Sequence, residues 1–323
     1  MRNIALGTTA GALLFGAVAS EGQAQTYPSR PLRLIVASAP GGSPDINARE
    51  MASELVKSMG QQVVVENRPG ASGIVGYELL AKATGDGYTF GITTNLVSTN
   101  PSLYAKLPYD FLRDFAPIIF YFRGVNVLTV GQNSPIKSVK ALVEHAKASP
   151  GKLTFGSSGV GATPHLTMEL FKSMTGTSMV HVPYKGTQMA VTDILGGQID
   201  ILCDNLASLI PLVKAGRLRA LAVTSLKRSP AVPDLPTLDE SGLPGYELTG
   251  WLGVAAPKAT PKEIVAKLNA EINKALKSDL ITKGIAARGG TPAGGTPDEF
   301  SDHVRREMDK MSKLLKTLGV KPQ

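Results

Sequence analysis

The chain has 323 residues, of which 43% are hydrophobic and only 19% are charged, so disorder is excluded and the length favours two domains. A single cysteine, Cys203, excludes an internal disulfide and a thiolate metal site. The formal net charge of +8 comes from scattered basic residues without interleaved aromatic side chains. This pattern argues against nucleic acid as a partner and favours a modest preference for anionic ligands.

The N-terminal segment differs from the rest of the chain. A basic residue near the start is followed by an apolar run over residues 4–18 and by small residues before position 25, as a signal peptidase requires. The run is too short to span a membrane. Residues 1–24 are therefore predicted to be a signal peptide, with a mature chain that starts near Gln25 and is exported to the periplasm.

The first long motif after this segment is a strand, a glycine turn and a helix start. Residues 32–37 are an apolar run with strand character, Gly41 and Gly42 form a turn, and Ser43 before Pro44 is typical of an N-cap and first helical position. A helix that begins at the carboxyl end of a buried strand directs unpaired main-chain N–H groups beyond the sheet edge. The motif predicts an anion site, which a ligand can approach closely because glycines lack side chains.

The next segments continue an α/β pattern. They are a helix after residue 43, a strand at 62–66, a helix at 74–83, a strand at 88–95, an irregular stretch at 100–115 and an apolar run at 118–130. Right-handed crossovers between such strands give a parallel sheet with helices on both faces. The run at 118–130 is expected to complete this first lobe and to cross to a second one.

The second lobe repeats the opening motif. Residues 152–155 form a short strand, residues 156–161 a loop of small residues, and Thr163-Pro164 a second cap and helix start before a helical segment at 165–174. One such motif would be weak evidence, because many α/β proteins contain capped helices. Two of them, in separate halves of the chain, favour two lobes that direct helix N-termini towards each other across a ligand cleft.

The other expected elements complete two doubly wound lobes. They are helices at 139–148, 187–195, 206–215, 261–277 and 297–318, strands at 179–182, 199–203, 218–224 and 251–257, and an ordered loop at 230–244. The predicted fold class is α/β, with a discontinuous first lobe (25–125 and 225–323) and a continuous second lobe (126–224). Two segments would cross between the lobes, which implies a hinge.

Polar side chains at other strand and helix ends are candidates for the same cleft. Asp45, in the first helical turn, either stabilises the helix dipole by about 0.3–1 kcal/mol or accepts a hydrogen bond from a ligand or cleft water. His165, in the equivalent turn of the second motif, either donates to an anion or has a structural role. The remaining candidates end strands at the same level and are Asn95, Tyr184 and Asp204.

An enzyme is the leading alternative. The small-residue loop lacks Gly-x-Ser-x-Gly spacing because of Val160, and lacks the dinucleotide-binding pattern because Pro164 occupies the last glycine position. The four histidines are scattered, so no metal or cofactor is expected. A secreted hydrolase using Ser157 or Ser158 would need His165 within about 3 Å of the hydroxyl as its base. A sensor component that binds the same ligand is a further alternative.

A series of short motifs extends along nearly the whole mature chain. They are Pro40-Gly41-Gly42 with Asp45 and Ala48-Arg49, Glu66-Asn67-Arg68-Pro69-Gly70-Ala71, Asp86-Gly87-Tyr88-Thr89, Asn100-Pro101-Ser102-Leu103-Tyr104, Leu107-Pro108-Tyr109-Asp110, Gly156-Ser157-Ser158-Gly159 through His165-Leu166, Pro183-Tyr184-Lys185-Gly186, and Leu195-Gly196-Gly197-Gln198. Together they resemble the substrate-binding proteins of the tripartite tricarboxylate transporters, the Bordetella uptake gene (Bug) receptor family. The resemblance implies a monomeric type II periplasmic solute-binding protein that binds a small organic carboxylate. Its partners would be integral membrane transporter subunits, and it would have no catalytic activity.

In that family the two loops bind one ligand carboxylate, partly through ordered water. The resemblance assigns this role to Gly41, Gly42, Ser43 and Asp45 on one side and to Ser157, Ser158 and Thr163 on the other. Relatives often have an aromatic residue and a proline at the strand end where this chain has Ala37-Ser38. An aromatic cover over the ligand is therefore expected to be absent. Ser38 is expected to donate a hydrogen bond to a more polar or longer acid, which leaves the ligand open.

Overall fold

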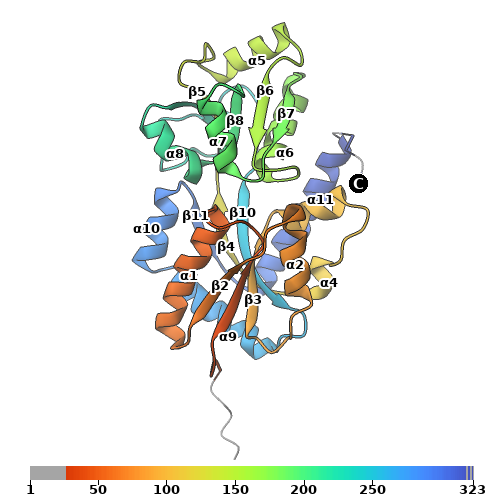
Figure 1. The fold of residues 1–323 in the computed structure, drawn as a ribbon, viewed down its shortest axis with the longest axis vertical. Coiled ribbons are helices and arrows are strands. Elements are labelled where there is room, and N and C mark those ends of the chain that lie inside the picture. The colour runs from red at the N-terminus through yellow and green to blue at the C-terminus, as the bar shows by residue number, and fades with distance from the viewer. Residues whose placement is uncertain (1–26, 318, 321, 323) are drawn as a thin grey trace, which may run out of the picture.

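The computed structural model describes residues 27–317, 319, 320 and 322, so the predicted signal peptide at 1–24 lies outside the described residues. Two β-sheets covered by helices form two lobes, the first below the second in Figure 1. The α/β class with two lobes is as predicted. Within the described ranges, no helix is long and apolar enough to cross a membrane.

The sheet of the first lobe has six strands in the order β11-β4-β10-β3-β1-β2. The strands are β1 (Leu32–Val36), β2 (Val63–Asn67), β3 (Thr89–Thr94), β4 (Phe115–Gly124), β10 (Gly250–Pro257) and β11 (Thr291–Gly294). Strand β1 pairs in parallel with both β2 and β3, with Leu34 opposite Val65 and Phe90. Strands β10 and β4 join the sheet antiparallel, so segments from both ends of the chain build this lobe.

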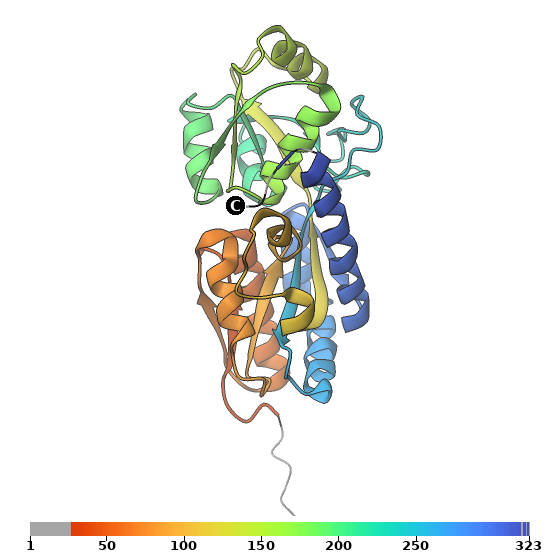
Figure 2. The ribbon, with the colours of Figure 1, turned by 90° about the vertical axis from the view of Figure 1, so that its right-hand side faces the viewer.

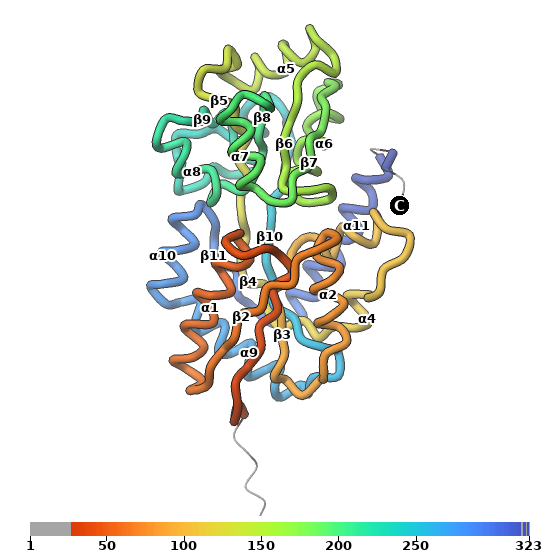
Figure 3. Tube along the Cα trace, in the orientation of Figure 1, coloured from red at the N-terminus to blue at the C-terminus, as the bar shows by residue number. Residues whose placement is uncertain are grey.

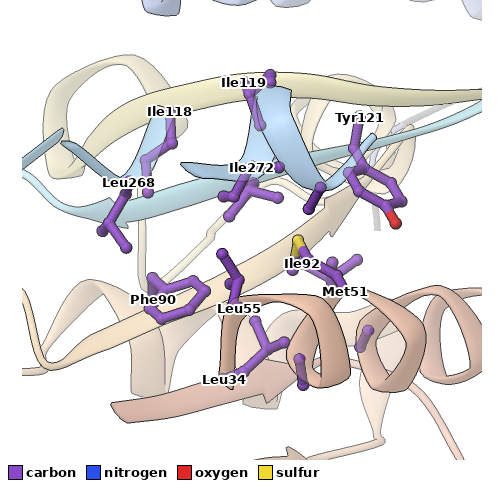
Figure 4. Packing of buried hydrophobic residues seen from close by; sticks show 14 of the residues in the cluster. Leu34, Met51, Leu55, Phe90, Ile92, Ile118, Ile119, Tyr121, Leu268 and Ile272 are labelled. Atoms are coloured by element: carbon purple, nitrogen blue, oxygen red, sulfur yellow. The ribbon is translucent and has the colours of Figure 1, made fainter. Parts of the chain in front are cut away.

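Helices cover both faces of this sheet. They are α1 (Ser43–Met59), the 3₁₀ helix η1 (Ala71–Gly73), α2 (Ile74–Ala81), α3 (Leu96–Leu103), α4 (Phe111–Asp114), α9 (Lys262–Ala275), α10 (Asp279–Ala287) and α11 (Pro297–Thr317). On one face, Met51 and Leu55 of α1 and Ile272 of α9 pack in one core with Phe90 (Figure 4). On the other face, Tyr77 of α2 packs in a cluster with Phe300 of α11.

The sheet of the second lobe has five strands in the order β7-β6-β8-β5-β9. The strands are β5 (Asn126–Gly131), β6 (Thr154–Ser157), β7 (Val180–Pro183), β8 (Ile201–Asn205) and β9 (Leu218–Val223), and the helices are α5 (Val139–Ala148), α6 (Thr163–Thr175), α7 (Thr187–Leu195) and α8 (Leu206–Lys214). Strand β6 pairs in parallel with β7 and β8. Strand β5 is antiparallel to β8 and β9.

Two chain segments pass between the sheets, one from β4 to β5 and one from β9 to β10 (Figure 3). They are hydrogen-bonded to each other. The Asn126 N–H donates to Thr224 Oγ1 at 3.2 Å, and the Thr224 N–H donates to the Asn126 carbonyl at 3.1 Å. The C-terminal part of α11 also reaches the second lobe, where Met311 and Leu315 join its core (Figure 2).

Some secondary-structure predictions were wrong. Part of the stretch expected to be irregular forms the end of α3 and all of α4, which begins at an Asp110 N-cap whose carboxylate accepts from the Leu112 and Arg113 N–H groups. Pro101, which falls in the stretch expected to be irregular, lies inside α3. Helix α10 and strand β11 were not predicted, although Ser278 caps α10.

Candidate functional site

Helices begin after the carboxyl ends of the parallel strands in both sheets. In the first lobe, α1, η1 with α2, and α3 follow β1, β2 and β3, and in the second lobe α6, α7 and α8 follow β6, β7 and β8. Because the strands of each set are parallel, these helix N-termini gather at one edge of each sheet. The two edges meet, since Ser72 Oγ donates to the Val160 carbonyl at 3.4 Å and a Cβ at Gly161 would overlap Leu103.

The first motif forms the predicted strand, turn and helix, with one correction. The N-cap of α1 is Gly42, which offers no side-chain cap, and Ser43 is the first helical residue rather than the cap. The turn depends on Gly41, whose φ of +79° is in the left-handed region. Within the described part of the chain, the N–H groups of Ser43 and Asp45 have no acceptor, and Pro44 has no N–H.

Asp45 is almost completely buried and stabilises this turn. Its carboxylate accepts from the Gly41 N–H at 2.9 Å, from Asn67 Nδ2 at 3.0 Å and from Arg49 Nε at 3.1 Å. Burial favours a higher pKa for Asp45, but the hydrogen bonds from Arg49, Gly41 and Asn67 outweigh it and lower the pKa. The contacts support the structural interpretation of this residue, and a direct ligand contact stays a prediction.

Ser38 lies at the end of β1 with an unsatisfied side chain. Its Oγ is buried and has no hydrogen-bond partner among the described residues, whereas its carbonyl accepts from Asn67 Nδ2 at 3.1 Å. A buried hydroxyl without a partner is costly, which makes Ser38 a candidate for contact with a ligand or water, and this contact stays a prediction.

The second motif repeats the first in detail. The N-cap of α6 is Ala162, so Thr163 is the first helical residue rather than the predicted cap, and Pro164 is the second. The Gly161 N–H donates to His165 Nδ1 at 3.2 Å, four residues on, as the Gly41 N–H donates to Asp45. The N–H groups of Thr163 and His165 have no acceptor in the described ranges. Each motif therefore presents two unpaired main-chain donors.

Ser157 is hydrogen-bonded to a histidine that the sequence analysis did not select. Its Oγ lies 2.7 Å from His181 Nε2, and Ser157 is fully buried. The ring of His181 stacks between Phe155 and His165, with ring centroids 4.8 and 4.1 Å apart. Burial, followed by the neighbouring His165 and Lys172, lowers the pKa of His181 to about 3. His181 could have been found by aligning β7 with its parallel neighbour β6, because it pairs with Phe155.

The His165 ring does not serve as a base for either serine. Its Nδ1 accepts from the Gly161 N–H, and burial, followed by Lys172, lowers its pKa, although Glu169 opposes this shift. The ring is therefore neutral near pH 7. The geometry required by the hydrolase alternative, a serine hydroxyl bonded to His165, is not present in the described part of the chain.

Ser158 and Asp204 are brought together with Thr187, which the sequence analysis also missed. Thr187 Oγ1 donates to Asp204 Oδ2 at 3.0 Å, the Asn205 N–H donates to Oδ1 at 2.6 Å, and the Ser158 hydroxyl is a further partner. Burial raises the pKa of Asp204 to about 6 despite these hydrogen bonds. Thr187 is the first residue of α7, and its position after a strand end was the signal for it.

Two predicted residues make other contacts. The Tyr184 hydroxyl donates to Asp193 Oδ2 at 2.7 Å, and burial and Asp193 raise its pKa to about 12. Asn95 caps α3 through its carbonyl, which accepts from the Ser98 and Thr99 N–H groups. Its side-chain amide has no hydrogen bond to the described residues. Ligand contacts of Tyr184 and Asn95 stay predictions.

The site offers neutral donors rather than a metal centre. In residues 27–317 and the described positions after them, no group of three His, Cys, Asp or Glu side chains is arranged to bind a metal ion. The donors available at the two edges are main-chain N–H groups at helix N-termini and hydroxyls. Such donors bind anions such as carboxylates.

Known proteins resemble the chain over nearly its whole length. BugT of Bordetella pertussis is 37% identical over 306 residues, covering 94% of each chain. The solved structure of R. palustris Rpa4515 with adipate is 40% identical with a TM-score of 0.88, covering 92% of this chain and 100% of that one. The periplasmic binding protein BugD is 34% identical with a TM-score of 0.86 and the same coverage. MatC from Rhodopseudomonas palustris with bound malate is 28% identical with a TM-score of 0.83, covering 90% and 100%.

A family model agrees with these similarities. The model described as "Tripartite tricarboxylate transporter family receptor" matches residues 47–320. The family consists of solute receptors rather than enzymes, which sets the hydrolase alternative aside. The match covers most of both lobes, and the resemblance drawn from short motifs is confirmed. The chain belongs to the tripartite tricarboxylate transporter receptor family, which includes the Bug proteins.

Proposed function

We propose that this protein is a periplasmic receptor that binds a short dicarboxylate between its two lobes and delivers it to the membrane subunits of a tripartite transporter. It acts as a monomer. The observation that carries the proposal is the set of four unpaired main-chain donors, at Ser43, Asp45, Thr163 and His165, on the two sheet edges that meet.

The electrostatics of these donors suit one carboxylate group. Helices α1 and α6 have 17 and 13 residues, long enough for a full helix dipole, and both direct their positive ends to the same region. Each helix terminus contributes about 0.3–1 kcal/mol to the binding of an anion, and up to ~2 kcal/mol where the site is partly buried. The bound carboxylate thus needs no arginine or lysine.

Polar groups beyond the four main-chain donors suit a ligand with a second polar end. The Ser38 hydroxyl is buried and unpaired, and the Ser158, Thr187 and Asp204 cluster lies at the opposite edge. Rpa4515 and MatC, which are 40% and 28% identical to this chain, have adipate and malate in their structures, and both ligands are dicarboxylates. A dicarboxylate therefore fits both the two groups of donors and the relatives.

The test is calorimetric titration of the exported chain after removal of co-purified ligand. Adipate, malate, their monoamides and a monocarboxylate of equal length are the probes. A dicarboxylate is expected to bind, its monoamide to bind more weakly, and thermal unfolding at about 100 times the dissociation constant to show roughly 2.7 kcal/mol of stabilisation. Equal binding of acid and amide, or no binding by any acid, would contradict the proposal.

A further inference from the structure

A second polar cavity lies outside the carboxylate site. It has a volume of about 200 Å³ and is lined by residues of β4, of β10 and the segment just before it, and of α11. Helix α11 runs along one side of the first sheet (Figure 2). None of its lining residues belongs to the two motifs described above. The volume is small compared with about 300–1,000 Å³ for sites of drug-sized ligands, so the cavity suits a small ion or acid.

Two residues that line the cavity carry unsatisfied ring nitrogens. Trp251 is 4% exposed, and its Nε1 is buried with no hydrogen-bond partner in the described ranges. His303 Nε2 is also buried and has no hydrogen-bond partner among the described residues. Indole Nε1–H is only a donor, and a buried donor without an acceptor is rare in native proteins. Both residues line the cavity, and an acceptor bound there would satisfy them where the wall shifts enough to expose the two nitrogens.

The two rings are held in fixed positions. His303 stacks on Phe120 with ring centroids 4.2 Å apart and meets Trp251 edge-on at 5.2 Å. Phe120 also meets Trp251 at 6.3 Å, and the Arg123 guanidinium lies 4.5 Å from the centre of the Phe120 ring. The donors therefore do not need to be ordered by the ligand, which lowers the entropic cost of binding.

The rim of the cavity is cationic. Arg123, Arg306 and Lys310 outnumber the carboxylates of Glu247 and Glu307. Glu307 lies 3.8 Å from Lys310, whereas Arg123 and Arg306 form no ion pair with the described residues. Burial, followed by Arg123, Arg306 and Lys310, lowers the pKa of His303 to about 4, which is consistent with a positive potential at this place.

We propose that this cavity is a second binding site, specific for a small oxyanion of the carboxylate or phosphate class. Trp251 Nε1–H and His303 supply hydrogen bonds from the inner wall, and Arg123 and Arg306 supply the opposite charge. The proposal stands independently of the function proposed for the interlobe site, because it shares no residue with it.

The single tryptophan of the chain allows a direct test. The exported chain, labelled with ¹⁵N, is titrated with inorganic phosphate and, separately, with acetate and malate, at constant ionic strength set with chloride. The one indole N–H signal reports on Trp251 alone. It is expected to move saturably with phosphate or with a carboxylate, and the anion that moves it at lower concentration identifies the class.

A matched pair of variants tests the specificity of the effect. Arg306→Ala removes a cation that lines the cavity, and Arg305→Ala removes an exposed cation from the neighbouring position of α11. Arg306→Ala is expected to weaken the titration about tenfold, since a hydrogen bond to a charged group is lost. Arg305→Ala is expected to change it by less than about twofold. An indole signal that does not move, or equal effects of the two variants, would overturn the proposal. The comparison of the two variants separates this cavity from the interlobe site, because neither variant changes a residue of the two interlobe motifs.

Discussion

Whether a buried polar side chain is already hydrogen-bonded within the chain indicates whether it has a structural role or is free to contact a ligand. Asp45 and Ser157 both belong to the predicted binding motifs, yet their side chains are satisfied within the chain, by Gly41, Asn67 and Arg49 and by His181. The Ser38 hydroxyl is buried and unsatisfied. The difference matters because removal of a satisfied group costs stability, whereas removal of an unsatisfied one relieves a penalty.

Ser38→Ala is therefore expected to separate stability from binding. Loss of a buried unpaired hydroxyl should leave the free energy of unfolding unchanged or raise it by about 1 kcal/mol. If Ser38 donates to the ligand, affinity should fall about fivefold to tenfold, as for one lost hydrogen bond. Urea unfolding of the ligand-free protein and calorimetric titration measure the two quantities. Ser58→Ala, on the outer end of α1, is the control and should change neither. A destabilised variant with normal affinity would show that Ser38 is structural.

Asp204 gives a prediction on pH. Its folded pKa of about 6 exceeds the ordinary value of 3.8, so the folded state favours the protonated acid. Between pH 4 and pH 6, Asp204 loses its proton in the unfolded chain at a lower pH than in the folded chain. The free energy of unfolding therefore falls as the pH rises. Asp204→Asn should remove this loss. Its free energy of unfolding should exceed that of the wild-type protein at pH 7 by on the order of 3 kcal/mol, with no difference at pH 4.

The control for Asp204→Asn is Asp309→Asn, an exposed acid on α11. Thermal unfolding of the ligand-free proteins at pH 4, 5, 6 and 7 is the measurement. The control should follow the wild-type curve over the whole range. A constant difference between wild-type protein and Asp204→Asn at every pH would show that the pKa of Asp204 is not raised in the folded state.

At the scale of elements, the two binding motifs are the same device. Each joins a buried strand to a helix with proline as its second residue, and each closes the turn by a hydrogen bond from a glycine N–H to a side chain four residues on. The device leaves the first helical N–H groups free for a ligand. A carboxylate of Asp45 in one motif and the Nδ1 of His165 in the other serve the same purpose.

Gly161→Ala tests the contact between the elements of the two lobes. Gly161 has φ of +77°, and a Cβ there would overlap Leu103 of the other lobe. Gly216, with φ of +66°, has no atom within 4 Å of the same position. Alanine in the left-handed region costs about 1–2 kcal/mol, so both Gly161→Ala and Gly216→Ala should lower the free energy of unfolding by that amount.

Only the first of these variants is expected to weaken binding. The overlap is with Leu103 Cδ1, and if this side chain keeps the two loops apart, ligand affinity in Gly161→Ala should fall at least about tenfold, since a misplaced pair of donors loses more than one hydrogen bond. Calorimetric titration of both variants decides the matter. Equal affinities in Gly161→Ala and Gly216→Ala would show that the loops do not need to approach each other to bind the ligand.

The sequence allowed much of this architecture to be predicted, because local signals specify it. The strands and helices of both motifs follow from apolar runs, glycines and prolines, and the resemblance to the receptor family rests on the same segments. His181 and Thr187 were missed because their importance depends on which strands pair. The edge strand β11 was missed because so short an element is stabilised by pairing with β4 rather than by its own pattern. Helix α10 was missed although Ser278 and Asp279 are ordinary signals of a helix start.

At the scale of the molecule, the two lobes are joined by few structures. The chain crosses between the sheets twice, and α11 reaches from the first lobe into the core of the second. The lobe limits predicted at 125–126 and 224–225 stay a prediction. The hydrogen bonds between Asn126 and Thr224 tie the two crossing segments together at this position.

Thr224→Val tests whether this connection sets the relative position of the lobes. The substitution removes the acceptor of the Asn126 N–H and leaves a buried donor unpaired, which should lower the free energy of unfolding by about 1–3 kcal/mol. Thr129→Val is the matched control. Its Oγ1 donates to the Leu202 carbonyl at 2.8 Å. This buried hydrogen bond lies within the sheet of the second lobe and does not join the crossing segments. Both variants should lose stability, because both break a buried hydrogen bond.

The two variants should differ in the distance between the lobes. Spin labels on exposed positions of α1 and α5, measured by pulsed electron resonance, report the interlobe distance with and without a dicarboxylate. Thr224→Val should broaden the distance distribution of the ligand-free protein, because one of the two hydrogen bonds that tie the crossing segments is lost, and ligand should narrow it again. Thr129→Val should match the wild-type distribution. If both variants give the wild-type width of the distance distribution, the hinge does not lie at Asn126 and Thr224. The contacts of α11 with the core of the second lobe would then be the better candidate for what sets the relative position of the lobes.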